Sequence, residues 1–248
     1  MSTLVSFTLD NLGDAADLQR GVIQAPRAPG TNPPLEQGYP ALLELFGRHE
    51  VPLTCFVEGW SARQYPDYLR QIRALGHEIG MHGWQHEAWA QLDDSAVATL
   101  ATRATESIAE ALGEAPRAFR APGGISSPYT QQVLVELGFD VDASYRVDPQ
   151  PTLSETGLAC LPYQWAGVDA THWLWNRHSP DEAERQWHAA LDKTSAAGLP
   201  FVFIWHPHVM GIHPEGLEVG ARLLRYLRDN PAFDIVSLRE LRQYLFAA

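Results

Sequence analysis

The residues best suited to chemistry are two histidines, His82 and His86, four positions apart in the segment HGWQH. On one face of a helical turn, two imidazoles at this spacing can bind a single metal ion. The same spacing also arises by chance in surface or capping histidines. Because the pair begins at the end of the buried strand expected over residues 77–82, the sequence favours a metal site over a surface role.

Three further reactive side chains also stand at the ends of apolar segments. Asp10 ends FTLD, Arg120 precedes the rigid turn APGG, and His206 ends the most apolar run, FVFIWH. Each has an ordinary alternative, namely a loop cap, a surface charge and a satisfied core histidine. In a functional site, however, an arginine can orient a carboxylate, and a partly buried imidazole beside a metal suits a general acid.

Short apolar runs alternate along the chain with amphipathic segments, a pattern typical of βα units around a parallel sheet. The expected strands are residues 4–9, 52–57, 77–82, 118–122, 139–144, 201–206 and 233–237. The expected helices occupy residues 61–75, 94–112, 128–137 and 216–228, with others starting at 180 and 238. Seven such units predict an α/β fold, a distorted (β/α)7 TIM-like barrel, in a single domain over residues 1–248.

Several of these helices are expected to begin at a serine that caps the first turn. The predicted caps are Ser61 with Gln64, Ser127 before Pro128, Ser179 with Glu182, and Ser237 with Glu240.

Two segments lack a sustained period. Residues 24–40, rich in proline and glycine, are expected to form a loop, and residues 146–180 an irregular excursion on the active face. Tryptophans occur in this excursion and near the histidine pair: Trp165, Trp173, Trp175, Trp84 and Trp89. They belong either to the core or to an aromatic pocket that stacks on a sugar or planar ring.

Reactive residues from distant parts of the chain come at the ends of different expected strands: Asp10, His82, Arg120, Asp142 and His206. In a parallel barrel these ends share one rim, where the active sites of such barrels are found. The sequence therefore predicts that the five side chains converge.

Bulk properties limit the partners. The formal charge of −12 disfavours nucleic acid and anionic membrane surfaces, and no apolar run approaches a membrane span. A small-molecule substrate is expected. No secretion signal is found at the amino terminus, so we expect a cytoplasmic protein, with buried free thiols at Cys55 and Cys160. A homo-oligomer stays open, since no surface stripe singles out an interface.

These segments, in this order, resemble the signature blocks of the polysaccharide deacetylase family, also called carbohydrate esterase family 4, over residues 4–208. FTLDN resembles the family's Thr-Phe-Asp-Asp block, and HGWQH its His-x-x-x-His block. FRAPGG resembles the Arg-x-Pro-x-Gly block, and FIWH the Leu-x-His block near the carboxyl terminus.

The resemblance implies a role for each matched residue. Asp10 becomes the general base oriented by Arg120, His206 becomes the general acid, and Asp142 matches the acidic residue that supports this histidine. His82 and His86 become metal ligands. The residues expected to contact substrate are Trp84, Pro122, Gly123, Tyr145 and His208.

One departure from the family pattern concerns the metal. The family's second aspartate, a metal ligand, is Asn11 in this chain. An amide oxygen is a neutral, weaker donor than a carboxylate, so metal affinity should fall. The expected cofactor is a divalent metal, with zinc favoured by its imidazole ligands. Asp14 could replace the lost ligand only if its loop bends back.

The resemblance implies a metal-dependent hydrolase of an amide carbon–nitrogen bond. The expected reaction is deacetylation or deformylation of an N-acyl amino sugar or related small metabolite. The segment from His206 to Gly211 looks more like the cytoplasmic branch with allantoinase-like members, so one alternative is a cyclic amide hydrolase without tightly bound metal. A further alternative is a non-catalytic binding protein.

Overall fold

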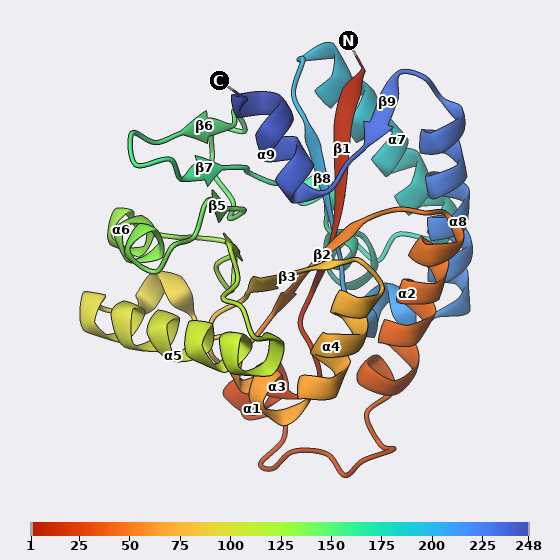
Figure 1. The fold of residues 1–248 in the computed structure, drawn as a ribbon. Helices are drawn as coiled ribbons and strands as arrows, with labels where there is room; N and C mark the ends of the chain where they lie inside the picture. The colour runs from red at the N-terminus through yellow and green to blue at the C-terminus, as the bar shows by residue number, and fades with distance from the viewer. Residues whose placement is uncertain (1, 248) are drawn as a thin grey trace.

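The computed structural model describes residues 2–247 and shows an α/β fold built on one strongly curled sheet (Figure 1). Its strands are β1 (Thr3–Asp10), β2 (Leu53–Val57), β3 (Glu78–Met81), β4 (Ala118–Phe119), β5 (Val141–Asp142), β6 (Thr152–Leu153), β7 (Ala159–Cys160), β8 (Phe201–Trp205) and β9 (Phe233–Ile235). They are ordered β6-β7-β5-β4-β3-β2-β1-β8, and β9 pairs with the start of β1. All pairs are parallel except β6 with β7.

This arrangement confirms the distorted barrel, and every expected strand is present at least in part, although β4 ends at Phe119, before Arg120. The sheet carries two strands more than predicted, because β6 and β7 form a short hairpin within the excursion. Further along the excursion, Val168 pairs with Ile204 of β8. The excursion therefore runs from β7 back to β8 and contributes to the open side of the curled sheet.

Nine α-helices surround the sheet within the described residues, besides short 3-10 and π-helical turns: α1 (Ala15–Gln19), α2 (Tyr39–Arg48), α3 (Gly59–Gln64), α4 (Pro66–Ala74), α5 (Asp94–Leu112), α6 (Pro128–Glu136), α7 (Pro180–Ala196), α8 (Pro214–Asp229) and α9 (Leu238–Phe246). In Figure 1, α2, α7 and α8 lie on one side of the molecule, and α5 and α6 on the other. The helices at Ser127, Ser179 and Ser237 begin with the predicted side-chain caps.

The prediction that Ser61 caps the start of a helix is wrong. Ser61 lies inside α3, and its buried hydroxyl donates to the carbonyl oxygen of Leu12 instead of capping a helix. A second helix, α4, begins at Pro66, because proline fixes φ in the helical range and needs no N–H partner in the first turn.

The core is densest around β1 and β8. All five residues of β8 are buried, as expected for a strand covered on both faces. Phe7 of β1 stacks on Phe203 with ring centroids 4.7 Å apart, and Trp205 lies 5.7 Å from Trp187 of α7. This packing fixes the strand that ends at His206. Cys55 and Cys160 are buried free thiols, as predicted.

None of the helices within residues 2–247 has the length and apolar character needed to cross a bilayer.

Candidate active site

A cavity of about 330 Å³ opens at the carboxyl ends of β1, β3, β4 and β8. Its size lies at the lower end of the range for small-molecule sites. The polar and charged residues that line it are Asp10, Asn11, Arg20, His82, His86, Arg120, Tyr163, His206 and His208. Four of the five residues predicted to converge are therefore present, and Asp142 is the exception.

Asp10 and Arg120 form a buried ion pair in this cavity. Arg120 Nη1 donates to Asp10 Oδ1 at 2.6 Å, and also lies 2.7 Å from Thr8 Oγ1. Burial raises the pKa of Asp10, but Arg120, with weaker effects of His82 and His206, outweighs burial and holds this pKa below its usual value. Asp10 is therefore an ionised carboxylate at neutral pH, ready to accept a proton.

Arg120 is itself held in place by the backbone. Its Nε donates to the carbonyl oxygen of Ala143 at 3.0 Å, and its guanidinium carbon lies 4.3 Å from the centre of the Phe56 ring. A flat guanidinium fixed in this way presents a rigid donor to the carboxylate.

His206 has a different carboxylate partner from the one predicted. Its Nδ1 lies 2.6 Å from Asp169 Oδ1, and its backbone N–H donates to Asp169 Oδ2 at 2.7 Å. Burial lowers the pKa of His206, but the charge and hydrogen bond of Asp169 outweigh burial and raise this pKa above its usual value. The imidazole is therefore biased toward its protonated form, as a general acid requires.

Asp142 does not contact His206, which corrects the expectation that it supports this histidine. Its carboxylate accepts hydrogen bonds from Ser126 Oγ at 2.8 Å, Gln131 Nε2 at 3.2 Å and the backbone N–H of Ser144 at 3.1 Å. These contacts hold the turn that follows β5 rather than the acid.

Asp169 was missed because it lies in the excursion, where no periodicity predicts an element. Asp169 is brought to the end of β8 by its neighbour Val168, which pairs with Ile204. That pairing is a tertiary contact between segments about 35 residues apart, so sequence patterns do not reveal it.

His82 and His86 are brought together by a loop, not by the predicted helical turn. Residues 82–88 contain no helix, and both Gly83 and His86 have left-handed backbone, with φ of 72° and 71°. Glu87 closes the loop by accepting N–H groups of Trp84 and Gln85. The two imidazole centroids lie 4.9 Å apart.

Both imidazoles are neutral and therefore able to bind a metal. Burial lowers the pKa of His82, although Asp10 opposes this effect. Burial, with the charge of His82, lowers the pKa of His86 to about 3. Because His82 Nδ1 lies 2.9 Å from the carbonyl oxygen of Arg120, its Nε2 is left on the side of Asp10, 3.9 Å from Oδ2.

Asn11 supplies the third donor. Its Oδ1 is buried without a hydrogen-bond partner among the described residues, and its backbone is left-handed, with φ of 71°. An orphaned buried carbonyl oxygen that lines the same cavity as two imidazoles fits a divalent metal. Across residues 2–247, no three His, Cys, Asp or Glu side chains are grouped so that they could hold a metal.

Asp14 cannot take the place of the family's aspartate. Both of its oxygens are occupied by donors from Arg27, Asn32 and Tyr65, and its side chain is buried away from the cavity lining.

The predicted substrate contacts are met in part. Gly123 and His208 line the cavity, whereas Trp84, Pro122 and Tyr145 are not among its lining residues. Trp84 instead packs under the Arg103 guanidinium, whose carbon lies 3.6 Å from the ring centre. Tyr145 packs behind the lining, with ring centroids 5.8 Å from Tyr163.

Of the tryptophans, Trp165 and Trp175 line the cavity, with ring centroids 5.4 Å apart, and Trp175 is 61% exposed. Trp173 packs on Trp187, and Trp89 is buried with its N–H on Thr130, so these two belong to the core. The excursion thus forms an aromatic wall of Tyr163, Trp165 and Trp175 on the active face, as predicted for part of this set.

Comparisons with known proteins agree with the sequence motifs. The family model described as polysaccharide deacetylase matches residues 29–141. A peptidoglycan deacetylase of Helicobacter pylori is 32% identical over 109 residues, which cover 44% of this chain but only 37% of that protein. The chain therefore spans little more than a third of this relative's length.

Solved structures agree over the whole chain. A Mycobacterium smegmatis protein, provisionally named a polysaccharide deacetylase, has a TM-score of 0.89 at 26% identity, with 99% of this chain and 91% of that one covered. The structure of PuuE allantoinase has a TM-score of 0.81 at 20% identity, with coverage of 99% and 91%. The second likeness is one of fold.

Fold and site together define an α/β barrel protein with a buried Asp–Arg pair and a His–Asp pair at the carboxyl rim of its strands. The family model and the structural neighbours confirm the predicted resemblance to the polysaccharide deacetylase family. The matched segment 29–141 contains HGWQH and FRAPGG, whereas Asp10 and His206 lie outside it.

Proposed function

We propose that this protein hydrolyses the amide carbon–nitrogen bond of a small N-acyl compound, such as an N-acetyl or N-formyl amino sugar. One observation carries the proposal: a carboxylate paired with Arg120 and an imidazole that Asp169 biases toward its protonated form line the same cavity. A matched base and acid are needed for hydrolysis but not for binding alone.

Asp10 acts as the base. Its ionised carboxylate accepts a proton from a water molecule while the water oxygen bonds to the acyl carbon. Arg120 keeps the carboxylate charged and oriented through this step, because the guanidinium is fixed by the Ala143 carbonyl oxygen. A divalent metal held by His82, His86 and Asn11 would polarise the acyl carbonyl and acidify the water.

His206 acts as the acid. Its Nδ1 is engaged by Asp169, so Nε2 is the ring nitrogen that remains free to donate a proton. Donation to the amide nitrogen accompanies cleavage of the carbon–nitrogen bond. The products are a carboxylic acid and an amine. Asp10 gains the proton that the water loses, and His206 loses the proton that the amine nitrogen gains.

The cavity favours a compact substrate. At about 330 Å³ it accommodates one sugar or ring, and Trp165 and Trp175 provide faces on which such a ring can stack.

The test is a panel of N-acetyl amino sugars, N-formyl amino sugars and cyclic amides, incubated with metal-supplemented protein. Release of acetate or formate with a stoichiometric amine supports the proposal. Ring opening of a cyclic amide alone, especially after chelation, would replace it by an allantoinase-like activity. Ligand binding without any hydrolysis across the panel would indicate a binding protein.

A further inference from the structure

The cavity contains an arginine that the proposed mechanism does not use. Its lining includes two arginines and four histidines but a single carboxylate, that of Asp10, which Arg120 already neutralises. The second arginine is Arg20, which follows helix α1 and stands at the mouth with its side chain 55% exposed.

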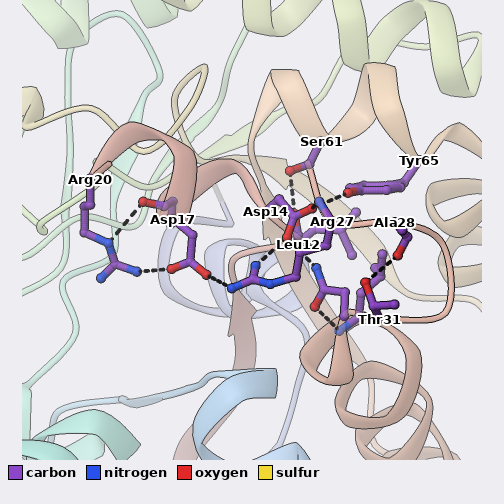
Figure 2. Close-up of polar contacts among 12 residues, drawn as sticks. Leu12, Asp14, Asp17, Arg20, Arg27, Ala28, Thr31, Ser61 and Tyr65 are labelled. Atoms are coloured by element: carbon purple, nitrogen blue, oxygen red, sulfur yellow. Dashed lines mark hydrogen bonds and ion pairs between the residues drawn. The ribbon is translucent and has the colours of Figure 1, made fainter. Parts of the chain in front are cut away.

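Arg20 is not a freely moving surface side chain. Its Nη2 donates to Asp17 Oδ1 at 3.0 Å, and its Nε donates to the carbonyl oxygen of Ala16 at 3.0 Å. Asp17 is fixed in turn, since Arg27 Nη2 donates to its other oxygen at 2.7 Å. Figure 2 shows this chain of contacts running from Arg20 through Asp17 to Arg27.

The chain of contacts ends on a buried anchor. Asp14 is fully buried and accepts donors from Arg27 and Tyr65 (Figure 2). It also accepts a donor from Asn32, which lies with Arg27 in the connection after α1, whereas Tyr65 lies between α3 and α4. Surface ion pairs contribute little when they are isolated, but a network fixed at a buried carboxylate holds its outer member in one geometry. The structure thus positions Arg20 at the mouth.

Arg20 retains donor capacity toward the cavity. Within residues 2–247 its Nη1 has no hydrogen-bond partner, and the guanidinium keeps N–H groups in a fork that matches carboxylate or phosphate oxygens.

We infer that Arg20, positioned by the Asp14–Arg27–Asp17 network, binds an anionic oxygen group of the substrate, a carboxylate or a phosphate. The inference rests on the proposed function and narrows its substrate class to anionic N-acyl compounds. Neutral oligosaccharides would leave the guanidinium without a partner.

The experiment compares ligands that differ only in charge. The probes are N-acetylglycine against its neutral amide, and N-acetylglucosamine 6-phosphate against N-acetylglucosamine. Calorimetry measures Kd, and product release measures kcat/KM, for the wild type, Arg20→Gln and Arg70→Gln. Arg70 is a matched control, because it pairs with Asp67 at 2.6 Å and with the Ala111 carbonyl at 3.0 Å, is 56% exposed and lies outside the cavity.

We expect the wild type to prefer at least one anionic probe, and Arg20→Gln to reduce this preference about 10- to 100-fold, the range of a charge-assisted hydrogen-bonded contact. Arg70→Gln should retain it. A preference within the N-acetylglycine probes identifies a carboxylate as the group that Arg20 binds, and a preference within the N-acetylglucosamine probes identifies a phosphate. A wild type without preference, or an Arg20→Gln variant that keeps it, overturns the inference. Preferential binding without hydrolysis of any probe leaves Arg20's role intact and contradicts the proposed function instead.

Discussion

At the scale of single residues, the acid and the base depend on buried partners that set their charge. Asp10 would be disfavoured as an anion by burial, and His206 would be disfavoured as a cation, without Arg120 and Asp169. The two partners shift the pKa values apart in the direction that catalysis needs. Activity should therefore extend over the pH range above the pKa of Asp10 and below that of His206.

Asp169→Asn tests this dependence. Since Asp169 raises the pKa of His206, its removal lowers that pKa, and the alkaline limb of the kcat/KM profile moves to lower pH. The acid limb, set by Asp10, should move little. The expected loss of activity at pH 8 is about 10- to 100-fold greater than at pH 6. An unshifted alkaline limb, measured on folded protein, would contradict the role of His206 as the acid.

The site was predictable where a reactive residue ends a buried strand. Asp10, His82, Arg120 and His206 follow β1, β3, β4 and β8, and the sheet topology alone brings them to one rim. Asp169 and Arg20 were not singled out, because they lie in irregular segments whose positions depend on tertiary contacts.

At the scale of elements, the strands and capped helices followed from local chemistry, whereas several connections did not. The expected loop 24–40 is wrong over its last seven residues, because a π-helical turn over Pro34–Gly38 leads directly into α2. The prolines of this segment lie in first helical turns, where proline is tolerated. The loop 82–88 was mistaken for a helical turn, since a period of four does not distinguish it from a left-handed turn at Gly83.

Glycine 59 illustrates how closely the elements pack behind the site. A Cβ at Gly59, in α3, would lie 2.4 Å from Ala104 Cα of α5. We expect Gly59→Ala to reduce the free energy of unfolding by about 1–3 kcal/mol through overpacking. Gly47→Ala, in α2 with no atom within 4 Å of the added Cβ, should be neutral or stabilising by about 0.5–1 kcal/mol. Urea denaturation measures both, and equal effects would refute the close approach.

At the scale of the whole molecule, the curled sheet brings Asn11, after β1, and the two histidines of the loop after β3 to one cavity, where they form the proposed metal-binding set. None of the three ligands carries a negative charge, because Asn11 is an amide and both imidazoles are neutral. Metal binding is therefore expected to be sensitive to each ligand.

Metal content tests this expectation. The wild type supplied with zinc should retain near-stoichiometric metal by elemental analysis, and His82→Ala/His86→Ala should lose it. Asn11→Asp should tighten binding about tenfold or more in a competition titration with a chromogenic chelator, because a carboxylate replaces a neutral amide. Equal metal content in the wild type and the double variant would place the metal elsewhere.

The most direct measurement of the central claim is kcat for amide hydrolysis by Asp10→Asn, compared with Asp67→Asn as an exposed control. Circular dichroism and thermal unfolding would establish that the variant folds, since Arg120 loses its charged partner. We predict a loss of kcat of about 10²- to 10⁴-fold for Asp10→Asn and none for Asp67→Asn. Full hydrolytic activity in folded Asp10→Asn protein would contradict the assignment of Asp10 as the base and, with it, the proposed mechanism.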